Sequence, residues 1–244
     1  MKAIILAAGE SKRLRPLTNT TPKCLLELDG KAIIDYQIDS LRRLSITDIV
    51  VVTGFMAEKL ETHFCINHSD INWTFIRSEN YQKTYPAHGL WLAKEHLTDD
   101  FLYLNADVVC HQDILKTVLE SEYPSVTAIQ RSDWDEEEVN VIFKESTHEI
   151  EEMGKYVAKE LSNGEFIGVT KIGKEFSVEL IKVLDQFIER KEFKKFAADS
   201  INLTIQRGQS MYASDTSHLP AIEIDTPEDL KNAKLKITAI KKIK

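Results

Sequence analysis

The stretch AIILAAGESKRLRPLT, residues 3–18, indicates the architecture of this chain more clearly than any other part of the sequence. Residues 3–6 form a short apolar run typical of a buried parallel strand, and a loop containing Gly9 follows. In an open parallel sheet, ligands bind at the carboxyl ends of the strands. The small residues 7–9 let the backbone approach a ligand closely, their N–H groups can cradle a phosphate, and Arg13 adds positive charge. The alternative for this loop taken alone is an ordinary βα turn with solvated basic residues.

Strand and helix patterns alternate from this stretch to about residue 130. Short apolar or β-branched runs predict strands, and an apolar period of about 3.6 residues predicts helices. The predicted strands lie at residues 3–6, 48–53, 73–76, 101–104 and 126–130. The predicted helices lie between them, at residues 33–44, 57–64, 89–97 and 114–119. This alternation predicts right-handed βαβ units and a mostly parallel sheet.

The second half of the chain has a different pattern. Its predicted elements are neighbouring antiparallel strands at 139–143, 149–153 and 166–172, helices at 176–190 and 195–206, and a late strand at 221–224. Thr226 at a cap position, followed by Pro227 and then Asp229, marks the start of a last helix. We therefore expect an α/β fold with a Rossmann-like, mixed but mostly parallel sheet flanked by helices. A small antiparallel subdomain is expected beside it, within one domain spanning residues 1–244.

The composition is that of an ordinary globular protein, with 43% hydrophobic and 29% charged residues. The formal net charge is −8 and the basic residues form no cluster, which argues against a nucleic-acid partner. No stretch reaches the roughly 18 apolar residues of a membrane span, and the N-terminal apolar run is too short for a signal peptide. The three cysteines lie far apart, which indicates buried or idle thiols in a reducing compartment. We expect a cytoplasmic protein without a membrane partner, and the sequence does not indicate its oligomeric state.

Two aspartates follow predicted strands. Asp107 comes shortly after the strand at 101–104, and Asp225 ends the strand at 221–224, so both lie at the expected ligand edge of the sheet. Mg²⁺ prefers carboxylate ligands and usually takes only one or two from the protein, so the pair is a candidate Mg²⁺ site. Asp after a strand is also commonly a turn or cap residue, and that alternative stays open for each aspartate alone. Because Thr226 can cap the last helix, Asp225 is free for another role.

Residues 2–34 resemble the nucleotidylyltransferase superfamily of sugar-nucleotide pyrophosphorylases and small cytidylyltransferases. The resemblance rests on residues 5–9 (ILAAG), 13–18 (RLRPLT), 22–26 (PKCLL) and 30–31 (GK). It implies a fold of the nucleotide-diphospho-sugar transferase type, with an NTP-binding half at 1–130 and an acceptor-binding half at 131–244. The nucleotide-binding residues that it implies are Leu6, Ala7, Ala8, Gly9, Arg13, Lys23 and His88, with Arg13 and Lys23 gripping the triphosphate. The superfamily usually has a second glycine where this chain has Ser11.

Two acidic segments also resemble the superfamily. Residues 105–107 (NAD) look like its metal-binding loop, and residues 223–230 (EIDTPEDL) look like its second metal segment. The resemblance implies that Asp107 and Asp225 bind Mg²⁺ and act in catalysis together with Arg13 and Lys23. No general base is required, because a phosphate or phosphonate nucleophile has a second pKa of about 6 and is already anionic at pH 7. Alignment and charge neutralisation then account for the catalysis.

The acceptor-binding residues implied by the resemblance lie in the second half of the chain. Lys155 resembles the superfamily's lysine that contacts the acceptor phosphate, and Glu165 belongs to a segment at the acceptor pocket. Each has an ordinary alternative, a solvated lysine and a strand-end glutamate. Trp134, in the acidic run 133–138, is a candidate for recognising a cationic head group, or the anchoring aromatic of a solvated loop. His88 lies where relatives place residues near the base and acceptor, or it simply begins a helix.

The nucleotide and the acceptor are less closely defined. The chain length and residues 91–97 (WLAKEHL) resemble the cytidylyltransferase branch, whose members use phosphocholine, inositol phosphate or phosphonates, although Tyr85-Pro86 replaces paired asparagines often seen there. The leading prediction is Mg²⁺-dependent transfer of CMP from CTP to a small phosphorylated or phosphonylated acceptor, with release of pyrophosphate. The first alternative is a sugar-1-phosphate nucleotidylyltransferase that uses UTP, dTTP or GTP. The second is a non-catalytic nucleotide-binding regulatory module, which the presence of both metal carboxylates disfavours.

Overall fold

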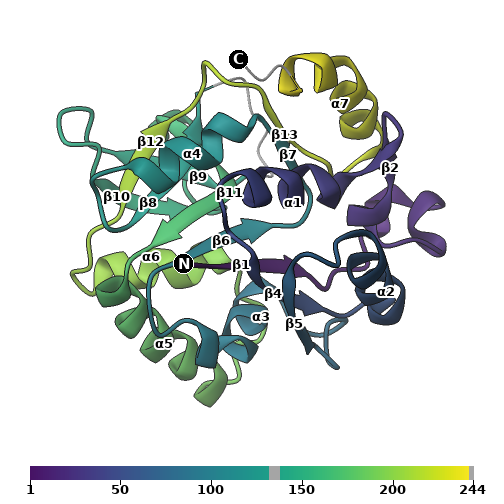
Figure 1. Ribbon diagram of the computed structural model, residues 1–244. Coiled ribbons are helices and arrows are strands. Elements are labelled where there is room, and N and C mark those ends of the chain that lie inside the picture. The colour runs from purple at the N-terminus through teal and green to yellow at the C-terminus, as the bar shows by residue number, and fades with distance from the viewer. Residues whose placement is uncertain (132–137, 242–244) are drawn as a thin grey trace.

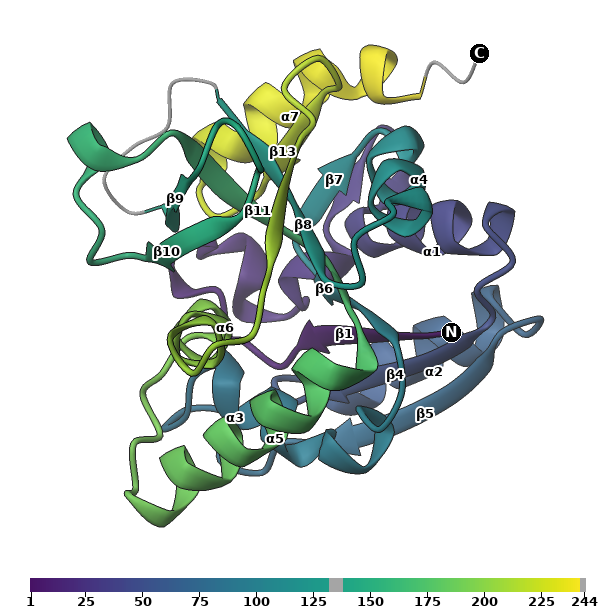
Figure 2. The same cartoon turned by 90° about the vertical axis from the view of Figure 1, so that its left-hand side faces the viewer.

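A central β-sheet with helices on both faces forms the body of the protein in the computed structural model, which describes residues 1–131 and 138–241 (Figure 1 and Figure 2). The strands of the described residues are β1 Lys2–Ala7, β2 Glu27–Leu28, β3 Lys31–Ala32, β4 Asp48–Thr53, β5 Asn72–Arg77, β6 Phe101–Asn105, β7 Val108–Cys110, β8 Val126–Gln130, β9 Asn140–Phe143, β10 Ile150–Gly154, β11 Gly164–Ile172, β12 Tyr212–Asp215 and β13 Ala221–Glu223. Strands β2 and β3, and β7 and β13, form two small sheets of their own beside the central sheet. Its α-helices are α1 Ile33–Arg43, α2 Ala57–Asn67, α3 Pro86–Leu92, α4 Gln112–Glu120, α5 Lys174–Glu189, α6 Ala197–Gln206 and α7 Pro227–Ile240. Short 3₁₀ turns are η1 Lys12–Leu14, η2 Leu17–Asn19, η3 Lys23–Leu25, η4 Lys94–His96 and η5 Lys159–Leu161.

The first half of the chain builds the parallel part of the sheet. The strand order is β10-β9-β11-β6-β1-β4-β5, and β6, β1, β4 and β5 are parallel neighbours. Side chains alternate between the two faces of a strand, so Ile4 and Ile5 of β1 enter different cores. Val50 and Val51 of β4 are divided in the same way. Both faces of β1 and β4 are covered, which agrees with their nearly continuous apolar runs, whereas the edge strand β5 is only partly buried.

Strand β11 connects the parallel part of the sheet to the second half of the chain. It pairs antiparallel with β6, β8 and β9, and β8 has β12 as a parallel neighbour. The register on β8 shifts between Phe166 and Thr170, where Gly168 has a φ of 71°. A Cβ on Gly168 would come within 2.6 Å of the Asn105 side chain, so a glycine is needed where β11 passes the end of β6. The mixed, mostly parallel sheet and the small antiparallel part around β9 and β10 confirm the predicted fold class.

Helices α3, α5 and α6 cover one face of the sheet, and α1, α2 and α4 cover the other (Figure 1). Most of these helices begin and end within a few residues of their predicted bounds. The helix predicted at 89–97 was placed too late: α3 begins at Pro86, which suits the first helical position, and residues 94–96 form the separate turn η4. No helix within residues 1–131 and 138–241 is long and apolar enough to cross a membrane. The assignment of one domain with two functional halves stays a prediction.

Helix α7 begins as the sequence predicted. Thr226 Oγ1 accepts a hydrogen bond from the Asp229 N–H at 3.2 Å, and Asp229 Oδ2 accepts one from the Thr226 N–H at 2.7 Å, which completes a capping box. Asp229 Oδ2 also accepts from the backbone N–H of Asp225 at 3.0 Å. The cap therefore fixes the backbone of Asp225 and leaves its carboxylate available for other partners.

Candidate active site

A cavity of about 310 Å³ lies at the carboxyl ends of β1 and β6, beside the loop that follows β1. This volume is in the range of small-molecule sites. Most of the residues predicted to bind ligands line it, namely Leu6, Ala7, Ala8, Gly9, Arg13, Lys23, Asp107, Lys155 and Asp225. Among the residues that the structure describes, His88 and Glu165 do not belong to the lining. Trp134 lies outside the described residues.

The loop after β1 is held by contacts to its neighbours. Ala8 O accepts a hydrogen bond from the Phe55 N–H at 3.0 Å, and a Cβ on Gly54 would lie only 2.7 Å from the same oxygen. Ser11 has a φ of 48°, in the left-handed region where glycine is favoured, and its carbonyl accepts from Thr18 Oγ1 at 2.9 Å. Ser11 thus adopts the conformation that the superfamily's usual glycine would favour, and Thr18 holds it there.

A lysine lies between two aspartates at one end of the cavity. Lys23 Nζ is 2.6 Å from Asp107 Oδ2 and 2.6 Å from Asp225 Oδ1. Arg13 Nη2 is 2.7 Å from the other carboxylate oxygen of Asp225. Burial would lower the pKa of Lys23, but the charges of Asp107 and Asp225 outweigh it and raise this pKa above its ordinary value. Lys23 is therefore a fixed cation at this end of the cavity.

Backbone and side-chain hydrogen bonds hold the two acidic segments together. Strands β7 and β13 form an antiparallel pair, and beyond it the Ile224 N–H donates to the carbonyl of Asp107 at 3.1 Å. From the other side, Gln37 on α1 donates through Nε2 to the carbonyls of Asn105 and Val108, at 2.6 and 2.7 Å. The loop that carries Asp107 is therefore fixed from two directions.

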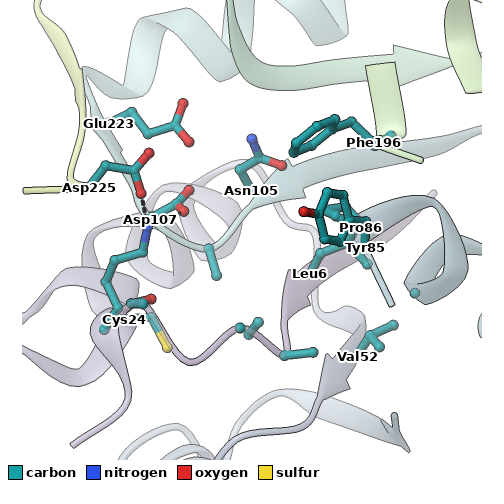
Figure 3. Close-up of a pocket in the computed structure, with 18 of the residues that line it drawn as sticks. Leu6, Cys24, Val52, Tyr85, Pro86, Asn105, Asp107, Phe196, Glu223 and Asp225 are labelled. Atoms are coloured by element: carbon teal, nitrogen blue, oxygen red, sulfur yellow. Dashed lines mark hydrogen bonds and ion pairs between the residues drawn. The ribbon is translucent and has the colours of Figure 1, made fainter. Parts of the chain in front are cut away.

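Glu223 is a third acidic residue at this end of the cavity, and we did not predict it as a ligand. One oxygen from each of Asp107, Glu223 and Asp225 lies within 4.8 Å of the others (Figure 3). Alternate residues of an extended segment point to the same side, so the two-residue spacing from Asp225 is the sequence signal that indicates Glu223. Burial, followed by the charges of the two aspartates, raises the pKa of Glu223 well above its ordinary value.

These three carboxylates fit a hard divalent cation. Asp107 Oδ1 is buried and has no hydrogen-bond partner within the described part of the chain. A buried carboxylate oxygen without a partner is costly, and a cation held there would supply one. Carboxylate oxygens are also the protein ligands that Mg²⁺ prefers. Asp107, Glu223 and Asp225 are thus a donor set suited to Mg²⁺, and the choice of Mg²⁺ stays a prediction.

His88 is not part of the cavity lining, although Pro86 and Gly89 of the same helix are. Its ring centroid lies 5.6 Å from that of Trp91 and 6.0 Å from that of Phe193. Burial lowers the pKa of His88, and within residues 1–131 and 138–241 its Nδ1 has no hydrogen-bond partner. These contacts favour the alternative in which His88 is a packing residue at the start of α3.

Aromatic residues line the end of the cavity opposite the carboxylates (Figure 3). The rings of Tyr85 and Phe196 pack with their centroids 5.0 Å apart. Lys155 Nζ lies 5.1 Å from the centre of the Phe196 ring, so the predicted acceptor lysine does reach the cavity. On β11 the cavity is lined by Phe166, whereas its neighbour Glu165 is not part of the lining, in keeping with the alternation of side chains along a strand.

Cys24 also lines the cavity, next to Lys23. Burial and the charge of Asp107 raise the pKa of Cys24 to about 12. Its thiol is therefore protonated at neutral pH, whereas the nucleophilic form of cysteine is the thiolate. Cys24 fills space at this site, as we expected from the sequence.

Comparison with known proteins identifies the family. Residues 2–154 match the protein family described as "Nucleotidyl transferase". The chain belongs to this family. A CTP:phosphoglutamine cytidylyltransferase from Campylobacter jejuni is 32% identical to it over 196 residues, which are 74% of this chain and 76% of that protein. A UTP–glucose-1-phosphate uridylyltransferase from Haloferax volcanii is 31% identical over 139 residues, which are 56% of each protein.

The fold of this chain is also similar to that of a solved nucleotidyl transferase structure. The inositol-1-phosphate CTP transferase from T. maritima superposes with a TM-score of 0.83 over 99% of this chain and 96% of that chain, at 21% sequence identity. The nucleotidyl transferase fold predicted from the sequence is therefore confirmed, and so is the family. The roles of individual residues, including Lys23, Asp107 and Asp225, stay predictions.

Proposed function

We propose that this nucleotidyl transferase moves CMP from CTP to a small phosphorylated or phosphonylated acceptor, with Mg²⁺ as its cofactor and pyrophosphate as its second product. The observation that carries the proposal is the position of Lys23 between Asp107 and Asp225 in the cavity beside the β1 loop. Phosphate transfer relies on such positioned charges rather than on covalent catalysis. The similarity to a CTP:phosphoglutamine cytidylyltransferase over 74% of the chain supports CTP as the nucleotide.

The β1 loop and two cations position the nucleotide in this proposal. The small residues 7–9 leave their backbone accessible to the base and ribose, and Lys23 and Arg13 neutralise the triphosphate. Both cations are paired with aspartate in the nucleotide-free protein, so they have to exchange carboxylate oxygens for phosphate oxygens when CTP binds. Mg²⁺, held by Asp107 and Asp225 with Glu223 beside them, would supply further charge neutralisation at the phosphates.

The acceptor attacks without a general base from the protein. Its phosphate or phosphonate group has a second pKa of about 6, so an anionic oxygen is available at pH 7. This oxygen forms a bond to the α-phosphorus of CTP while the bond from that phosphorus to pyrophosphate breaks. Lys155 is the residue that we assign to the acceptor's phosphate group, because its Nζ lies at the aromatic end of the cavity. The rings of Tyr85 and Phe196 then contact the organic part of the acceptor.

Release of pyrophosphate tests the proposal. The protein is incubated with Mg²⁺ and each of CTP, UTP, dTTP and GTP, combined in turn with phosphocholine, phosphoglutamine, an inositol phosphate, an aminoalkyl phosphonate and glucose 1-phosphate. We expect selective release with CTP and a non-sugar acceptor. Release with UTP and glucose 1-phosphate would establish the sugar-nucleotide alternative instead, which the similarity to the H. volcanii uridylyltransferase favours. Nucleotide binding without release from any pair would point to the regulatory module.

A further inference from the structure

A second cluster of metal-ligating side chains lies outside the CTP cavity. Asp35 belongs to α1, His63 belongs to α2, and His68 follows the end of α2. His63 Nε2 is 2.7 Å and His68 Nε2 is 2.9 Å from the same oxygen, Asp35 Oδ1. One ligand atom of each residue lies within 4.8 Å of the others. None of the three residues lines the cavity.

This cluster is built into the junction of α1 and α2. The side chains of Asp35, His63 and His68 are 13%, 21% and 7% exposed. The backbone of His68 is fixed at both polar atoms, because its N–H donates to Phe64 O at 2.9 Å and its carbonyl accepts from Trp73 Nε1 at 3.0 Å. Side chains that are already ordered lose little conformational entropy when they bind an ion. The partial exposure of His63 leaves a path for an ion from solvent.

We propose that Asp35, His63 and His68 form a binding site for a divalent ion of the zinc class. Two imidazole nitrogens and one carboxylate oxygen suit Zn²⁺ or Co²⁺, whereas Mg²⁺ prefers oxygen ligands only. Three protein ligands leave a fourth tetrahedral position for water. Ligands of tetrahedral Zn²⁺ lie about 3.3 Å apart, so the two Nε2 atoms have to move only slightly away from Asp35.

The outer hydrogen bonds of the cluster show where its protons lie without an ion. A guanidinium can only donate, so His68 Nδ1, 3.1 Å from Arg42 Nη2, accepts, and the proton of His68 is on Nε2. Asn67 Nδ2 lies 3.1 Å from His63 Nδ1 and favours the same tautomer of that ring. An ion bound at Nε2 therefore requires each imidazole to carry its proton on Nδ1 instead. The total number of protons does not change.

Arg42 opposes this change of tautomer. With an ion on Nε2, the Nδ1–H of His68 faces an N–H of Arg42, and two donors cannot pair. Ion pairs with Asp39 at 2.7 Å and with Asp70 at 2.5 Å keep the guanidinium in place. Arg42→Gln removes this donor, because the glutamine side chain ends two bonds before the position of Nη2 and leaves Nδ1–H open to a water that can accept from it. Arg42→Gln should therefore raise the affinity for Zn²⁺, an effect that unspecific chelation by surface histidines does not predict.

Titration of the full chain with Zn²⁺ against a chromogenic chelator tests the proposal. Excess Mg²⁺ competes with Zn²⁺ for the carboxylates of the CTP cavity, and a Cys65→Ser background removes an exposed thiol of α2 that is another potential Zn²⁺ ligand. We expect one equivalent of Zn²⁺ to bind, with an affinity at least about tenfold lower in His63→Ala and in His68→Ala. His218→Ala, a change at an exposed histidine elsewhere, should leave the affinity unchanged.

Two further measurements keep the result interpretable if an alanine variant does not fold. The visible spectrum of Co²⁺ bound to the Cys65→Ser protein reports nitrogen coordination with all three ligands intact. Arg42→Gln should bind Zn²⁺ about tenfold more tightly. Absence of stoichiometric Zn²⁺ binding, equal affinity in the histidine variants, or no gain in Arg42→Gln would each overturn the proposal. The site does not depend on the proposed function, so Asp225→Asn should retain it.

Discussion

Replacing Gln37 by leucine should weaken metal binding at the cavity, and by more than an equally destabilising substitution elsewhere in the protein would. Gln37 is 2% exposed and donates through Nε2 to the carbonyls of Asn105 and Val108, on either side of Ala106 and Asp107. Leucine has a similar volume but no donor. Gln37→Leu therefore removes both hydrogen bonds that hold this loop from the side of α1.

The size of the effect follows from those two bonds. A hydrogen bond contributes about 0.5–1.5 kcal/mol net, and a carbonyl left buried without a partner costs about 1–3 kcal/mol. Two such carbonyls cost about 2–6 kcal/mol, and the loss of Gln37 Oε1, which is buried without a partner within the described residues, offsets part of this, so we expect Gln37→Leu to lower the free energy of unfolding by about 2–4 kcal/mol. If about 1.4 kcal/mol of this loss must be supplied again to order the Asp107 loop when the metal binds, the affinity for the metal falls about tenfold. The concentration of Mn²⁺ at half-saturation should therefore rise by about tenfold.

A matched control separates this local effect from general destabilisation. Gln130 is also buried, and it donates through Nε2 to the carbonyls of Thr216 and Leu219 at 2.9 and 3.2 Å. Gln130→Leu removes comparable bonds from a segment that carries none of the three carboxylates. Mn²⁺ binding is measured by electron paramagnetic resonance without nucleotide, well below the melting temperature of either variant. An equal shift of Mn²⁺ affinity in Gln37→Leu and Gln130→Leu, or no shift in either, would refute the reasoning.

Three other substitutions test the charges of the site. Asp107→Ala should abolish pyrophosphate release and leave the circular dichroism spectrum unchanged, and near-normal turnover would remove Asp107 from its assigned role. Lys23→Met should weaken CTP binding but strengthen Mn²⁺ binding without nucleotide, because Nζ no longer occupies the carboxylates. If equilibrium dialysis shows that both ligands bind more weakly, Lys23 does not exchange carboxylate oxygens for phosphate oxygens. Glu223→Gln should stabilise the metal-free protein more at pH 8 than at pH 5. Because the pKa of Glu223 is raised in the folded protein, its contribution to stability is complete below the unfolded pKa and is lost as the pH rises through the folded pKa. Melting curves of both proteins are measured in EDTA at the two pH values. A difference in stability that does not change with pH would argue against a raised pKa of Glu223.

The sequence predicted those parts of the site that depend on local pattern. Asp107 and Asp225 became candidates because each follows a strand, and a strand end can be recognised from an apolar run and the residues after it. That pattern alone left a turn or cap role open, and the resemblance to the superfamily decided the prediction. Residues 7–9 were found in the same way. Glu223 was missed because it lies inside a strand rather than after one, so that only its two-residue spacing from Asp225 indicates that both side chains point to the same side.

The position of β11 could not be predicted from the sequence. Its apolar residues indicate a strand, but nothing local specifies that it pairs with both β6 and β8. The same lack of local information explains why Glu165 was predicted to lie at the acceptor pocket although it does not line the cavity. Periodicity separates Glu165 from Phe166 as members of opposite faces, but it does not say which face meets the cavity. Here it is the face of Phe166, and the register shift that follows it near Gly168 is a property of strand pairing.

The ion pairs of Lys23 imply that CTP and the divalent cation bind cooperatively. Without a ligand, Lys23 balances the charges of Asp107 and Asp225. A cation bound without CTP would lie beside an ammonium of like sign, and CTP bound without a cation would bring phosphates toward unneutralised carboxylates. Each ligand should therefore raise the affinity for the other. Titration of CTP without acceptor, in Mg²⁺ and in EDTA, measures this coupling, and it should shrink in Lys23→Met. Equal dissociation constants for CTP under both conditions would mean that Lys23 does not leave the carboxylates when the nucleotide binds.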